Sequence, residues 1–231
     1  MKRILGITLA LVTAWTIPAI GDSTKIRDCS RGIGMNIVPL VWSPTEQIAS
    51  PKVVTLPKGT EATAGAAASA PIQIEVKALT DTRENQKRIG ENREDVKRGC
   101  VYPVITKDDP TKWTTERLRY LLGQLGYRVV EQGGDVILSG ELRQFFVTET
   151  GTYDGEIAFR LDATSKTGKP LWSGLVRGTN GHWGKSYKLA NYHETLSDAL
   201  IDAVENLTAD SNFAAAVGPS SKVAVEKGAT P

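Results

Sequence analysis

The chain of 231 residues has few of the residues from which catalytic and metal sites are built, with two cysteines and two histidines. His182 and His193 do not stand at zinc-ligand spacing with cysteines or carboxylates. The glycine-rich pieces at 32–34 and 123–126 lack the phosphate-loop pattern with its Lys-Ser/Thr ending, and no strand–turn–helix nucleophile elbow occurs. We therefore predict that the protein is not an enzyme, with no catalytic, cofactor-binding or metal-ligating residue and no cofactor.

A strong charge imbalance is also lacking. The net charge is +2, and the lysines and arginines are interspersed with aspartates and glutamates. Nucleic-acid binding needs a basic patch or stripe, so we predict no nucleic-acid partner. The hydrophobic share of 40% is enough for a packed core.

Long hydrophobic runs are absent except at the N-terminus. Lys2 and Arg3 precede the apolar residues 4–17, and the small residues of 18–21 follow. This order is typical of a secretory signal peptide, which we place at residues 1–21. The run is shorter than the ~20 residues of a membrane span. We therefore expect membrane contact only indirectly, or through an uncleaved signal as the alternative.

The two cysteines gain meaning from this predicted secretion. In an oxidising compartment Cys29 and Cys100 could form a disulfide, closing a long loop that contributes roughly 4 kcal/mol. The alternative is that Cys29 is a lipid-attachment site, but charged residues precede it, well beyond the apolar run. A free thiol is the third alternative, and two cysteines alone do not decide among them.

Residues 22–70 have the composition of an extended arm. Residues 58–70 are rich in alanine, glycine, threonine and serine, and prolines interrupt the part before them, at Pro39, Pro44, Pro51 and Pro57. The apolar patches 37–42 and 53–56 either pack locally against the domain, add an edge strand or dock on a partner.

The folded domain is expected at residues 71–213. Residues 72–78 alternate apolar and polar side chains, as a half-buried strand does. Residues 80–99 are highly charged without apolar periodicity and predict a long polar loop, either solvated or a partner surface. A helix follows, with Asp109 as its cap, Pro110 in its first turn and Gly126 at its end. Residues 127–130 predict a short strand.

Three predicted strands then form an antiparallel meander, at residues 135–148, 153–164 and 170–179. A glycine-rich loop at 180–188 follows, and Asn191 and Glu194 form a capping-box-like pair that opens a second helix. Residues 214–231 predict a disordered tail. The sequence thus predicts an α+β fold in the order β-α-β-β-β-β-α, with a mostly antiparallel meander sheet and two helices packed on one face.

Several short motifs of residues 72–213 resemble the YajG-type bacterial envelope lipoproteins. The motifs are Asp81-Thr82-Arg83, Arg88-Ile89-Gly90, Leu-Gly-Gln-Leu-Gly-Tyr at 122–127, Gly-Gly-Asp at 133–135 and Gly-Lys-Pro-Leu-Trp at 168–172. The resemblance implies a small α+β domain in the periplasm, associated with the outer membrane, and it supplies no catalytic residues. A recognisable lipid-attachment motif is missing from this chain.

These observations favour an interaction module, an accessory component of a cell-envelope assembly. Its expected partners are envelope proteins, with a homo-oligomer as a further expectation. The candidate partner surface comprises Asp81, Arg83, Arg88, Arg93, His182 and Trp183. The alternative is a small-ligand-binding protein or a hydrolase that uses the loop at 180–192.

Overall fold

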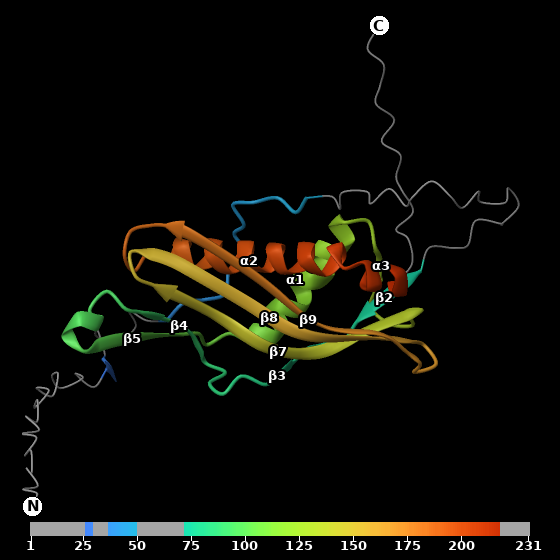
Figure 1. Cartoon of the computed structure of the whole chain (residues 1–231), viewed down its shortest axis with the longest axis horizontal. Helices are drawn as coiled ribbons and strands as arrows, with labels where there is room; N and C mark the ends of the chain where they lie inside the picture. The colour runs from blue at the N-terminus through green and yellow to red at the C-terminus, as the bar shows by residue number, and fades with distance from the viewer. Residues whose placement is uncertain (1–25, 30–36, 50–71, 218–231) are drawn as a thin grey trace, which may run out of the picture.

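The computed structural model describes residues 26–29, 37–49 and 72–217. Along the chain lie β1 (Arg27–Asp28), β2 (Gln73–Val76), β3 (Thr80–Asp81), β4 (Arg88–Asn92), the 3-10 helix η1 (Val96–Arg98), β5 (Cys100–Ile105), α1 (Pro110–Gln124), β6 (Arg128–Val130), β7 (Val136–Glu149), β8 (Thr152–Ser165), β9 (Pro170–Trp183), α2 (Leu189–Ala209) and α3 (Ser211–Val217) (Figure 1). The predicted α+β class is confirmed. The predicted signal peptide, the part of the predicted arm at 50–70 with its apolar patch 53–56, and residues 218–231 of the predicted tail lie outside the described residues.

The described strands form one mixed sheet built around β7. On one side β7, β8 and β9 are the predicted antiparallel meander. On its other side β2, β3 and β4 follow one another along β7, and all three run parallel to it. The predicted order was therefore incomplete, because it omitted β1, β3, β4, β5 and α3.

The predicted polar loop at 80–99 is wrong for its central part, which contains strand β4. The strand has the sequence Arg-Ile-Gly-Glu-Asn, with one large apolar residue, so its own pattern does not announce it. Its position comes from neighbours on both sides, β5 and β7. Ile89 is fully buried. A Cβ on Gly90 would lie 2.4 Å from the carbonyl oxygen of Val147, so only glycine permits this approach.

The first helix follows the prediction and the second does not. The side chain of Asp109 accepts hydrogen bonds from the N–H of Thr111 at 2.9 Å and of Lys112 at 3.2 Å, and Gly126 beyond the helix has a φ of +87°. Helix α2 instead begins at Leu189, and no side chain caps it. The amide of Asn191 donates to the carbonyl of Lys185 rather than capping the helix. Tertiary contacts thus override the predicted capping pair.

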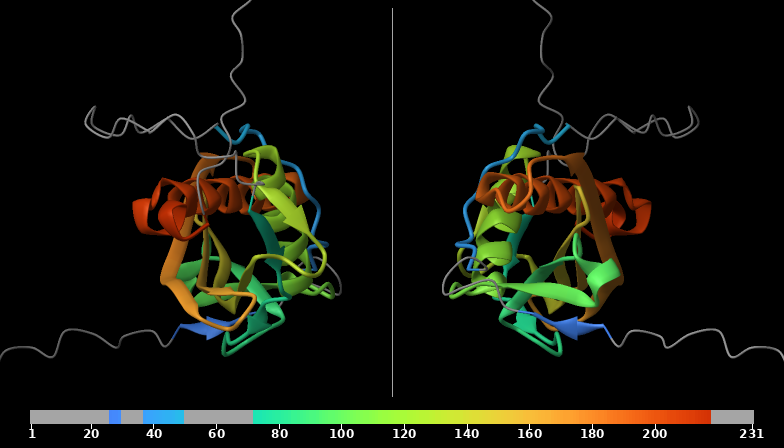
Figure 2. Two further views of the ribbon diagram at one scale, coloured as in Figure 1. Left: turned by 90° about the vertical axis from the view of Figure 1, so that its right-hand side faces the viewer. Right: turned by 90° about the vertical axis from the view of Figure 1, so that its left-hand side faces the viewer.

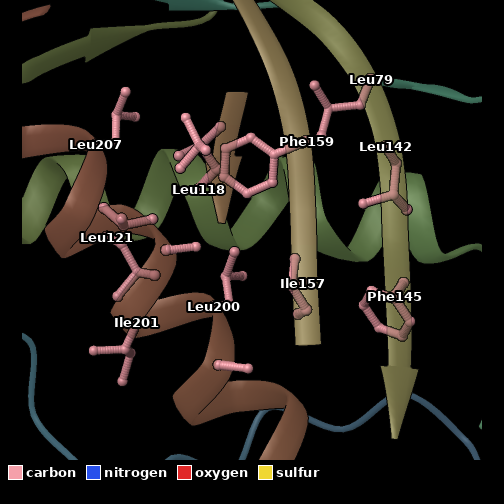
Figure 3. Packing of buried hydrophobic residues seen from close by; sticks show 14 of the residues in the cluster. Leu79, Leu118, Leu121, Leu142, Phe145, Ile157, Phe159, Leu200, Ile201 and Leu207 are labelled. Carbon is pink, nitrogen blue, oxygen red and sulfur yellow. The ribbon is translucent and has the colours of Figure 1, made fainter. Parts of the chain in front are cut away.

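The core lies between the sheet and the two long helices, which cover the concave side of the bent sheet (Figure 2). Leu118 of α1 lies beside Phe159 of β8, Leu200 of α2 points toward Ile157, and Leu121 of α1 lies against α2 (Figure 3). These contacts agree with the predicted packing of two helices on one face of the sheet. Phe213 of α3 is also fully buried, so the packed unit continues to the end of that helix.

Residues 37–49 of the predicted arm pack on the helices. Val38 is buried. The Trp42 ring lies 5.7 Å from that of Trp113 in α1, and the N–H of Thr45 donates to Asp198 of α2 at 2.9 Å. Of the alternatives for patch 37–42, local packing against the domain is observed, and Ile37 also forms a single parallel β-bridge with Ile105 at the end of β5.

Cys29 and Cys100 form a disulfide, with their Cα atoms 5.4 Å apart. The bond joins the ends of β1 and β5, which pair in parallel. Of the three alternatives, the disulfide is thus the one found. The sulfur of Cys29 is occupied and is not available for lipid attachment in this state.

Candidate interaction surface

The two regions predicted to bear the partner surface meet at one end of the sheet. The N–H of Arg93, just after β4, donates to the carbonyl of Glu149 at the end of β7 at 2.7 Å. The hydroxyl of Ser186 donates to the carboxylate of Glu94 at 2.7 Å. We call this end of the molecule, formed by residues 92–95, 149–154 and 180–188, the β9 end.

A buried carboxylate holds the β9 end together. Glu149 is fully buried. It accepts hydrogen bonds from the hydroxyl of Tyr153 at 3.0 Å, the N–H of Tyr187 at 2.8 Å and the hydroxyl of Tyr192 at 2.5 Å. The carboxylate therefore connects β7, β8, the loop at 184–188 and α2.

The two phenols remain protonated near neutral pH. Burial raises the pKa of Tyr153 to about 12, and the neighbouring Glu149 charge adds to this rise. Burial, followed by the hydrogen bond to Glu149, raises the pKa of Tyr192 far above its ordinary value. The arrangement suits a structural anchor. We did not predict Glu149 from the sequence. The sequence does contain a signal for its burial, because Glu149 continues the inward-facing positions of Phe145 and Val147 at every second residue of β7.

His182 and Trp183 lie on β9, not in the predicted loop, and they face opposite sides of the sheet. The His182 ring stacks on Tyr153 with centroids 5.8 Å apart, and its Nδ1 lies 3.2 Å from the hydroxyl of Thr195. Nε2 lies 3.8 Å from the carboxylate of Glu194. Trp183 is instead 78% exposed, the highest fraction among the large apolar residues of the described chain.

Asp81 and Arg83 organise the backbone rather than present a surface. The Arg83 guanidinium pairs with the carboxylate of Asp81 at 2.7 Å and also donates to the carbonyl of Phe145 at 3.3 Å. The side chains of Arg83 and Asp81 are 7% and 13% exposed. Both lie beside the middle of β7, because Asp81 is paired with Leu142.

Arg88 and Arg93 both form an ion pair with Glu91 on β4. Arg88 is also 3.1 Å from Asp28 of β1. The side chain of Arg93 is 50% exposed. Of the six predicted surface residues, Arg93 and Trp183 therefore combine exposure with a position at the β9 end.

A groove of about 580 Å³ lies on the outer face of the sheet next to Trp183. Its lining comes from β7, β8 and β9, namely Gln144, Phe146, Thr148, Asp154, Gly155, Glu156, Arg177, Thr179, Asn180 and Gly181. Within it Arg177 pairs with Glu156 at 2.8 Å. His182 is not among the lining residues, so the groove lacks the histidine on which the hydrolase alternative depends.

The described residues include no group of three or more His, Cys, Asp or Glu side chains placed to hold a metal ion. None of the helices described is both long and apolar enough to cross a bilayer.

Comparison with known proteins gives structural neighbours only. No protein-family model and no curated protein matches the sequence. A DUF330 protein from Xanthomonas campestris is 13% identical, with 75% of this chain and 92% of that chain covered and a TM-score of 0.49. A candidate lipoprotein from Caulobacter crescentus is 9% identical, with 63% and 91% covered and a TM-score of 0.42. The PelC dodecamer from Paraburkholderia phytofirmans is 12% identical, with 60% and 84% covered and a TM-score of 0.36.

These three neighbours are a DUF330 protein, a lipoprotein-like protein and PelC, and none of them bears the name YajG. The YajG-type resemblance stays a prediction. With TM-scores below 0.5 and identities of at most 13%, none of the three carries an argument about function.

Proposed function

We propose that the chain is a non-catalytic interaction module of the bacterial cell envelope, located in the periplasm and associated with the outer membrane through its partners. The observation that carries this proposal is Trp183, 78% exposed at the end of β9. A tryptophan in water leaves a large apolar surface unburied, and tryptophan is enriched among the residues that dominate binding energy at protein interfaces.

The surroundings of Trp183 support binding because they are held in place before a partner arrives. Glu149 fixes the loop at 184–188 through the N–H of Tyr187, and Ser186 connects that loop to Glu94. A rigid surface loses little conformational entropy on association, so more of the contact energy appears as affinity.

A non-catalytic role is supported by the structural use of Glu149 and of the His182 ring at the β9 end. The Glu149 carboxylate accepts three hydrogen bonds, and His182 is packed between Tyr153 and Thr195. The disulfide supports an extracytoplasmic location, because such bonds persist in oxidising compartments.

Affinity capture with two matched variants tests this proposal. Trp183→Ala removes the exposed ring, and Leu175→Ala removes a 70% exposed side chain from the same strand outside the β9 end. Both should fold normally, since neither side chain is in the core. We expect Trp183→Ala to lose the envelope proteins captured by the wild type and Leu175→Ala to retain them. Equal capture by all three chains contradicts the proposal.

Substitution is preferable to deletion of residues 80–99, because that deletion removes β4. The strand pairs with β5 and β7 and buries Ile89, so its loss disrupts the sheet. A missing partner would then report unfolding rather than a lost contact.

A further inference from the structure

Trp183 and the outer groove lie next to each other on one face and complement each other. We propose that Trp183 of one copy inserts into the outer groove of a second copy and the reverse, so that two chains form a two-fold dimer through this face. The inference rests on the proposed function, because it names a partner for the surface around Trp183.

The strand register places the ring and the groove on the same face. Directly opposite residues of neighbouring strands share a face, and Trp183 is opposite Thr152, Gly181 opposite Asp154, and Thr179 opposite Glu156. On the other side of β8, Glu156 is opposite Phe146. Trp183 therefore projects from the same outer face as Phe146, at one end of the groove.

This arrangement is self-complementary about Gly181. Strands rise by about 3.3 Å per residue, so Trp183 stands roughly 13 Å from Thr179, with Gly181 halfway between them. A two-fold axis through Gly181 brings Trp183 of each copy opposite Thr179 of the other, inside its groove. The side chain of Asp154 lies over Gly181, where a Cβ would stand 2.9 Å from its Oδ1, so the Asp154 carboxylates of the two copies face each other at the axis. A two-fold contact of this kind closes on itself and yields a dimer.

The groove supplies the contacts that an indole ring uses. Phe146 offers an aromatic surface and Arg177 a cation for the face of the ring. The indole N–H needs an acceptor, and the hydroxyl oxygen of Thr179, which lines the groove on the outer face, can accept it.

The charge of Asp154 should make the proposed dimer contact depend on salt concentration. Asp154 is opposite Gly181 in the sheet, so the Asp154 residues of both copies lie near the axis and repel each other. Added salt screens this repulsion while leaving the burial of Trp183 in place. We therefore expect association to strengthen with ionic strength.

Sedimentation of the purified, oxidised chain from micromolar to millimolar concentration tests the dimer. We expect dimers that Trp183→Ala weakens by roughly 30-fold or more, as for a central interface tryptophan. Phe146→Ala should weaken them too, while Leu175→Ala should not. In fluorotryptophan-labelled protein, the resonance that disappears in Trp183→Phe should shift with concentration in the wild type.

A chain that is monomeric throughout this range, or a dimer that Leu175→Ala weakens as much as Trp183→Ala, overturns the inference. Neither result decides the proposed function. A monomeric chain that still captures a different envelope protein through Trp183 refutes the dimer and leaves the proposed function in place. A dimer that forms through Trp183 while Trp183→Ala captures envelope proteins as well as the wild type does refutes the proposed function and leaves the dimer in place.

Discussion

The hydroxyl of Tyr192 should be a large contributor to the stability of the β9 end. It donates to the buried carboxylate of Glu149 at 2.5 Å, and Tyr192 is 2% exposed. A hydrogen bond to a charged group contributes about 1.5–3 kcal/mol to stability. We therefore expect Tyr192→Phe to lower the free energy of unfolding by about 2 kcal/mol, measured by urea denaturation at neutral pH. Tyr120→Phe, in a ring that is 49% exposed on α1, is the matched control and should change it by less than about 0.5 kcal/mol.

A double-mutant cycle assigns the loss to the carboxylate. Glu149→Gln keeps the shape of the side chain and removes its charge. A hydrogen bond between neutral groups contributes about 1 kcal/mol, so Tyr192→Phe should cost about 1 kcal/mol less in the Glu149→Gln background than in the wild type. Equal costs in both backgrounds, or a cost no larger than that of Tyr120→Phe, would refute the assignment of Glu149 as a charged anchor.

Three further predictions concern stability. Replacing Cys29 and Cys100 by serine opens a loop with a sequence separation of 71 and should lower the free energy of unfolding by about 4 kcal/mol, measured by urea denaturation. No change on substitution contradicts this. The pKa of Tyr153 is raised to about 12 from the ordinary value of 10.0, so its contribution to stability is complete below pH 10 and is lost as the pH rises toward 12. The free energy of unfolding should therefore depend less on pH across that range in Tyr153→Phe than in the wild type. The same pH profile in both chains would count against burial of the phenol. A Cβ on Gly178 would lie 2.1 Å from the carbonyl of Ala199 in α2, so Gly178→Ala should destabilise by about 1–3 kcal/mol. A Cβ on Gly123 in α1 meets open space, so Gly123→Ala should instead stabilise the protein by up to about 1 kcal/mol. A higher melting temperature for Gly178→Ala than for Gly123→Ala would refute the packing of α2 on β9.

The elements with strong local patterns could be predicted from the sequence. The strand β8 alternates apolar and polar residues over most of its length, and α1 carries an N-cap, a first-turn proline and a terminal glycine. Strand β4 could not be predicted, because its burial is imposed by β5 and β7 rather than encoded in its five residues. The start of α2 was misplaced for a similar reason, since Asn191 is used in a contact with the carbonyl of Lys185.

The candidate surface was predicted only in part. Charge and loop composition pointed to Asp81 and Arg83, but their pairing buries both side chains, and no local signal distinguishes that ion pair from an exposed one. Trp183 was predicted as a surface residue, but it was placed in a loop together with His182. If the period-two alternation had been continued through residue 183, it would have extended the last strand and placed His182 and Trp183 on opposite faces of the sheet.

Photocrosslinking in living cells tests the central claim most directly. A photoreactive residue is placed at position 183, and at position 175 as the control that is similarly exposed on the same strand. We predict crosslinked products at position 183, either with an envelope protein or with a second copy, and few or none at position 175. Equal yields from both positions, or none from position 183 in cells that contain the folded, disulfide-bonded protein, would contradict an interaction surface at the β9 end.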